Sequence, residues 1–196
     1  MTAPVAALPR RSPAVAIGSA VVAVVGCSLL AARPALLSSS QPAIALAFAF
    51  AGLLIVGVAV PLPPPPPPVV AARSPRHFAI ACMLGAVAFA AGRALIGGHA
   101  PTPVTLTAIA ANTLAALAEE IWFRRLCYGL LAPAGPVFAV VASSVLFAAV
   151  HVSTYGFAVL PLDLAAGALF GWQRAVTGSW TAPALTHVLA NILVLL

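Results

Sequence analysis

Carboxylates and imidazoles occur inside the apolar segments of this chain, where ionisable groups are rare. All three acidic residues, Glu119, Glu120 and Asp163, lie within or beside apolar sequence long enough to cross a membrane, and later apolar segments carry His151 and His187. A charged side chain at bilayer depth costs ~2.5 kcal/mol or more, so such a residue usually serves a function. Carboxylates and imidazoles also transfer protons in general acid–base catalysis. The sequence therefore predicts a site of carboxylates and imidazoles inside a helix bundle.

The adjacent glutamates begin the segment Glu-Glu-Ile-Trp-Phe-Arg-Arg, residues 119–125. On a helix, Glu120 and Arg124 are i, i+4 neighbours that can form an ion pair. Glu119 points about 100° away from Glu120, which leaves it available to the bundle interior. The alternative is that both glutamates merely pair with Arg124 and Arg125, but buried ion pairs contribute little to stability. A functional role for this pair is therefore favoured over ion pairing alone.

Spacing along the chain predicts that Glu119 and His151 lie at one depth in the bundle. The segment Ala-Pro-Ala-Gly-Pro, residues 132–136, breaks the helix between them. Glu119 lies 15 residues before Ala134, and His151 lies 16 residues after Gly135. At 1.5 Å of rise per residue, both should lie ~22–24 Å from the turn. An antiparallel hairpin would then bring the two side chains together.

The last apolar segment carries a second histidine with a polar neighbour. His187 and Asn191 are separated by four residues, so they project from one face of an otherwise apolar helix. That face is expected to point into the bundle. A helix-packing hydrogen bond is the alternative, since His and Asn can join membrane helices at about 1 kcal/mol each.

Composition identifies the class of protein. Hydrophobic residues make up 63% of the chain and charged residues 6%, whereas a soluble domain has about 25% charged residues. The mean hydropathy is +1.12. These values predict an integral membrane protein with an all-α fold. The nine basic residues are arginines scattered singly or in pairs, which is typical of charges that flank membrane spans, so nucleic acid is not an expected partner.

A pass along the chain predicts about seven transmembrane spans in a polytopic bundle. They lie at residues 14–32, 43–60, 77–96, 104–131, 137–153, 157–172 and 180–196. The proline run at residues 61–68 predicts an extended connector, because proline does not fit a helix interior. This divides the chain into an N-terminal part with two spans, residues 1–76, and a core bundle, residues 77–196.

The arginines also predict the orientation in the cell membrane. A cytoplasmic N-terminus places most of the arginines on the cytoplasmic side of alternating spans, as the positive-inside rule requires. Arg33 is then the exception on the outside, and Arg93 lies near the outer end of the third span.

Three motifs in the C-terminal half together resemble a known family. They are Glu-Glu-x-x-x-Arg at 119–124, Phe-x-x-x-His at 147–151 and His-x-x-x-Asn at 187–191. In this order they resemble the CPBP family, which comprises type II CAAX prenyl proteases and bacterial relatives linked to bacteriocin processing or immunity. The resemblance covers about residues 106–196, including Gly-x-x-x-Gly at 167–171 and Trp-Thr-Ala-Pro at 180–183.

The resemblance implies an intramembrane endopeptidase that hydrolyses a peptide bond of a membrane-associated protein or peptide. Glu119 would be the general base that activates water, assisted by His151. His187 and Asn191 would polarise the scissile carbonyl and hold the oxyanion. The implied partners are the lipid bilayer and the peptide substrate.

The resemblance also implies supporting residues and raises the question of a metal. Glu120 and Arg124 would hold the helix and the charge state of Glu119. One carboxylate and two imidazoles can bind Zn²⁺ with an open position for water, so Glu119, His151 and His187 are candidate ligands of a metalloprotease-type site. They are not arranged as His-Glu-x-x-His, and the sequence leaves open whether a metal takes part.

Two other functions are compatible with the same residues. One is a non-catalytic membrane scaffold or bacteriocin-immunity protein that uses the polar cluster for packing. The other is a proton-coupled transporter in which Glu119, His151 and Asp163 form a relay. Against the transporter, Asp163 lies near the start of a span, where a helix N-terminal role is expected, and inverted repeats are not apparent.

Overall fold

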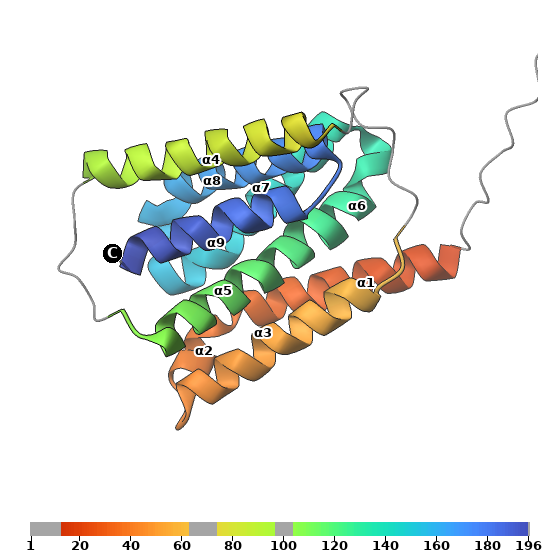
Figure 1. Ribbon diagram of the computed structural model, residues 1–196. Helices are drawn as coiled ribbons and strands as arrows, with labels where there is room; N and C mark the ends of the chain where they lie inside the picture. Colours follow the sequence, from red (N-terminus) through yellow and green to blue (C-terminus); the bar gives the residue numbers. More distant parts are fainter. Residues whose placement is uncertain (1–12, 63–73, 97–103, 196) are drawn as a thin grey trace, which may run out of the picture.

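The computed structural model describes residues 13–62, 74–96 and 104–195, and this part of the chain consists of helices joined by short turns, with no strand (Figure 1). The all-α prediction is therefore confirmed. The elements are α1 Pro13–Ala31, α2 Arg33–Leu37, α3 Pro42–Ala59, α4 Pro75–Ile96, α5 Leu106–Glu120, the π-helix η1 Ile121–Cys127, α6 Tyr128–Leu131, the 3₁₀ turn η2 Ala132–Ala134, α7 Pro136–Tyr155, the 3₁₀ turn η3 Phe157–Val159, α8 Leu160–Thr177 and α9 Thr181–Leu195.

Each of the seven predicted spans falls on helix in the described residues, so the chain is a multi-pass membrane protein. Four of the described helices, α1, α3, α4 and α7, are each long and apolar enough to cross a membrane, and α9 is a shorter apolar helix. The fourth predicted span is α5, η1 and α6 in sequence. Sequence reasoning missed the short helix α2. The proline connector lies mostly outside the described residues, and the cytoplasmic N-terminus stays a prediction.

Proline and glycine set the ends of the helices that matter for the site. Pro136 begins α7, where its missing N–H costs nothing and its fixed φ suits the first turn. Gly156 ends α7 with φ 77°, and Gly178 ends α8 in the left-handed region with φ 67°. A side chain is strained at such angles, so glycine favours a sharp stop. These stops keep α7, α8 and α9 short enough to pack side by side.

The C-terminal helices pack closely where small residues meet. Helix α8 lies along α7, α9 lies against both α4 and α5, and α3 lies against α5 (Figure 1). A Cβ atom at Gly167 would lie 3.0 Å from the Ser144 Cβ, and one at Gly171 would lie 3.0 Å from Val140 Cγ1. The Gly-x-x-x-Gly segment noted in the sequence is therefore the face of α8 that contacts α7.

The N-terminal hairpin of α1, α2 and α3 packs against the π-helix η1. The indole of Trp122 covers Gly26 of α1, and its N–H donates a hydrogen bond to the carbonyl of Ala23 at 3.2 Å. Arg125 donates to the carbonyl oxygens of Gly57 and Val60 at the end of α3. The hairpin is thus joined to the segment that follows the two glutamates.

Candidate active site

The two glutamates are the last residues of α5, directly before the π-helix η1. π-helical turns are rare and frequently occur at functional sites. Tyr128, the first residue after η1, donates its N–H to the carbonyls of Arg125 and Phe123 rather than to that of Arg124. The Arg124 carbonyl instead accepts a hydrogen bond from Nε of Arg174 on α8 at 2.9 Å. A side chain from a neighbouring helix therefore helps to hold the wide turn.

Glu120 forms the ion pair that the sequence predicted and also contacts a histidine. Its Oε2 lies 3.5 Å from Nε of Arg124, and both side chains are 0% exposed. Its Oε1 lies 2.9 Å from Nδ1 of His187 on α9. Arg124 also donates to the carbonyl of Gly167 at 3.2 Å, and its guanidinium lies 4.9 Å from the centre of the Phe147 ring. Glu120 and Arg124 therefore link η1 to α8 and α9.

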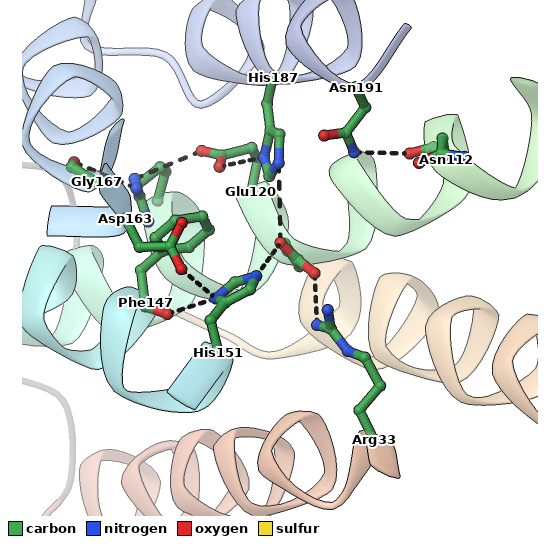
Figure 2. Close-up of polar contacts among 11 residues, drawn as sticks. Arg33, Asn112, Glu120, Phe147, His151, Asp163, Gly167, His187 and Asn191 are labelled. Carbon is green, nitrogen blue, oxygen red and sulfur yellow. Dashed lines mark hydrogen bonds and ion pairs between the residues drawn. The ribbon is translucent and has the colours of Figure 1, made fainter. Parts of the chain in front are cut away.

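Glu119 occupies the centre of the site, between the N-terminal hairpin and the histidine helices. Arg33, the first residue of α2, donates from Nη2 to Oε1 of Glu119 at 2.6 Å (Figure 2). The other carboxylate oxygen, Oε2, lies 3.7 Å from Nε2 of His151 and 3.9 Å from Nε2 of His187. The predicted equal depth of Glu119 and His151 is confirmed by this contact.

The hydrogen bonds of the histidines determine which ring nitrogen faces Glu119. His151 Nδ1 lies 2.7 Å from the carbonyl oxygen of Phe147, which can only accept, so Nδ1 carries the proton. His187 Nδ1 donates in the same way to the Glu120 carboxylate. In the neutral imidazoles both Nε2 atoms are then acceptors, and both point toward Oε2 of Glu119 (Figure 2).

Asp163 lies in the first turn of α8, as expected, and also faces the site. Its Oδ2 lies 3.8 Å from Nδ1 of His151 and makes no hydrogen bond within the described residues. The sequence favoured a helix N-terminal role for this residue, and the structure adds the proximity to His151. Asp163 therefore supplies a third carboxylate near the imidazoles.

Asn191 lies one turn after His187 on α9, beside the core of the site. Its Nδ2 donates to the backbone carbonyl of Asn112 on α5 at 3.3 Å (Figure 2). This bond fixes the amide between α9 and α5. The structure thus brings together Glu119, Glu120, Arg124, His151 and His187 in direct contact, and it places Asn191 at their edge.

A cavity of about 590 Å³ adjoins the histidines, between α4, α7, α8 and α9. Apolar side chains form most of its wall, and its polar groups belong to Arg93, His151, Tyr155, Asp163, His187 and Asn191. Glu119 is not among the lining residues, so the two imidazoles connect it to the cavity. A cavity of this size and composition fits a largely apolar ligand.

Comparison with known families finds one match in the C-terminal part of the chain. Residues 101–193 match the family model described as type II CAAX prenyl endopeptidase Rce1-like. This segment, the Rce1-like region, is therefore similar to that family. The family match confirms the resemblance seen in the sequence and supports a membrane-embedded protease of the type II CAAX kind. Comparison with the curated proteins found no match, and comparison with the solved structures found none.

The zinc ligands suggested for the Rce1-like region converge only in part. Both Nε2 atoms lie within 4 Å of the same oxygen of Glu119, whereas the other oxygen is bound by Arg33. Within the described ranges, no group of three or more His, Cys, Asp or Glu residues is arranged to hold a metal ion. Zinc binding therefore stays a prediction, and the hydrolysis proposed below uses the side chains alone.

Sequence reasoning missed two arginines that contact the site. Arg33 was assigned to the outside as an exception to the arginine pattern, but the structure places it on Glu119, outside the Rce1-like region. That exception was the available signal, because an arginine on the outer side of a span does not follow the positive-inside rule. Arg174 was assigned to the cytoplasmic side, and the chain gives no local indication of its bond to the Arg124 carbonyl.

Proposed function

We propose that the chain is an intramembrane endopeptidase that hydrolyses a peptide bond of a membrane-associated protein or peptide, with a water molecule activated by Glu119. The observation that carries this proposal is the convergence of two imidazoles on one oxygen of Glu119. Oε2 of Glu119 lies within 4 Å of Nε2 of both His151 and His187, and neither separation is a hydrogen bond. Such separations suit polar groups that share a water molecule.

A shared water would be set up for attack on a carbonyl carbon. Water can donate its two protons to Glu119 and His151, and transfer of one proton to Glu119 generates the nucleophile. The His151 ring is oriented to accept a proton from this water at Nε2, because its Nδ1 is held by the Phe147 carbonyl and lies near Asp163. The proton taken from water is then available for the leaving amine of the peptide.

We expect His187 and Asn191 to stabilise the oxyanion. Both line the cavity, and the donors would be the Asn191 amide and Nε2 of His187. This role requires a His187 ring with a proton on each nitrogen, so that Nδ1 donates to the Glu120 carboxylate at 2.9 Å and Nε2 donates to the oxyanion.

The experiment is a cleavage assay with purified protein in nanodiscs. The probes are an internally quenched peptide with a prenylated cysteine near its C-terminus and the same peptide without the prenyl group. Glu119→Gln and His151→Ala should each reduce kcat by at least about 100-fold, because each removes a proton-transfer group. Metal analysis of the same samples, with and without chelator, tests the zinc prediction.

Two outcomes would contradict the proposal. Undiminished cleavage by both variants would show that another site does the chemistry. A wild-type protein that cleaves neither peptide, while remaining folded, would favour the scaffold function. Faster cleavage of the prenylated probe would indicate that the apolar cavity binds the prenyl group. Equal cleavage rates for the two probes would indicate that it binds the peptide.

A further inference from the structure

Arg33 reaches the candidate active site from outside the Rce1-like region. It begins α2, between the two long helices of the N-terminal hairpin, and lies 86 positions before Glu119. Only 8% of the residue is exposed. Its guanidinium lies 5.3 Å from the centre of the Phe50 ring of α3, which covers it with apolar surface. The hairpin therefore buries a cation directly against the site.

The ion pair divides the two oxygens of Glu119 between two tasks. Oε1 is bound by Nη2 of Arg33 at 2.6 Å, whereas Oε2 faces the two imidazoles. A carboxylate held at one oxygen cannot rotate freely, so the second oxygen keeps its direction. Arg33 therefore determines which oxygen is presented for proton transfer.

The same contact gives Glu119 a guanidinium from outside the Rce1-like region. Glu119 and Glu120 are adjacent and buried, and Glu120 already has Arg124. A buried carboxylate without a counterion tends to bind a proton, and it then cannot accept one from water. Arg33 gives Glu119 its own guanidinium, so each of the two glutamates has one.

We propose that Arg33 is a positioning residue for Glu119, so that the N-terminal hairpin completes the catalytic site of the Rce1-like region. This inference rests on the proposed function, since it assigns to Arg33 the task of keeping Glu119 ionised and directed at His151 and His187. Arg33 does not line the cavity, so it acts through Glu119 and not on the substrate.

The first test compares Arg33→Gln, Arg33→Lys and Arg125→Gln in the nanodisc assay with the prenylated quenched peptide. Arg33→Gln should lower kcat by about 10- to 100-fold with little change in KM, because substrate contacts are intact while the base is misplaced. Arg33→Lys keeps a cation and should recover much of the rate. Arg125 also joins α3 to η1, and its hydrogen bonds to described residues go to backbone carbonyls, so its variant should lose stability without the selective loss of kcat.

The inference is overturned if Arg33→Gln keeps the wild-type kcat, or if Arg33→Gln and Arg125→Gln are impaired alike. Failure of the proposed function gives a different result, because the Glu119→Gln variant would then cleave the peptide as fast as the wild type.

A second test does not depend on cleavage. Arg33→Gln should lower the melting temperature by about 5 °C or more, because the buried Glu119 carboxylate loses its guanidinium partner. The same substitution in a Glu119→Gln background should cost much less. Equal losses in the two backgrounds would show that Arg33 and Glu119 are not coupled, which overturns the inference even in a protein that cleaves no probe.

Discussion

Replacement of Gly26 by alanine tests the packing of the N-terminal hairpin on the π-helix. The added methyl group would lie 1.8 Å from Cζ2 of Trp122 and 2.2 Å from Cε2. Carbon atoms in contact are about 3.5–4.0 Å apart, so the indole or α1 must move by about 2 Å. Trp122 is 1% exposed and cannot move into open space. Since Trp122 lies two residues after Glu120, the displacement would also reach the site.

Three contributions determine the change in the free energy of unfolding of Gly26→Ala. Overpacking of a buried site costs about 1–3 kcal/mol. Displacement of the indole breaks its hydrogen bond to the Ala23 carbonyl, which contributes about 1 kcal/mol. Alanine is better than glycine in a helix by about 1 kcal/mol, which offsets part of the loss. We therefore expect Gly26→Ala to lower the free energy of unfolding by about 1–3 kcal/mol.

The same helix offers a matched control. Gly18 is exposed, and a methyl group there meets no atom within 4 Å, so Gly18→Ala should stabilise α1 by up to about 1 kcal/mol. Thermal unfolding in detergent, followed by circular dichroism, should place the melting temperature of Gly26→Ala about 2–16 °C below that of Gly18→Ala. A melting temperature for Gly26→Ala equal to or above that of Gly18→Ala would refute the packing of Trp122 on Gly26.

Two further substitutions test the elements that hold the site. Arg174→Gln removes the donor to the Arg124 carbonyl, so it should lower stability by about 1.5–3 kcal/mol and also slow cleavage; a variant with wild-type stability would show that η1 holds without this bond. Gly167→Ala places a methyl group 3.0 Å from Ser144 Cβ and should cost about 1–3 kcal/mol, whereas Gly52→Ala meets nothing within 4 Å. Equal melting temperatures for the two alanine variants would contradict the close contact of α7 and α8.

The parts of the site that depend on helix periodicity could be predicted from the sequence. Glu120 and Arg124 pair because they are separated by one turn. Glu119 and His151 meet because a short break between two helices forces an antiparallel hairpin, in which equal distances from the turn give equal depth. Both contacts follow from the spacing of residues along the chain, which can be read directly from the sequence.

The parts that depend on packing between distant segments could not be predicted in this way. The pair of Arg33 and Glu119 arises because α3 packs on α5, and the chain between them gives no register for that contact. The π-helix also has no local signature, because Ile-Trp-Phe-Arg-Arg-Leu-Cys suits an ordinary helix. Its wide turn is accompanied by the bond from Arg174, which lies 50 residues further along the chain.

Adjacent glutamates explain why the site draws on both halves of the chain. Successive residues on a helix point about 100° apart, so Glu119 and Glu120 cannot share one set of partners. Glu120 faces α8 and α9, where Arg124 and His187 bind it, and Glu119 faces α2 and α7, where Arg33 and His151 lie. A second buried carboxylate therefore requires a second cation from a different helix. The Rce1-like region provides one of the two guanidinium groups, and the N-terminal hairpin provides the other.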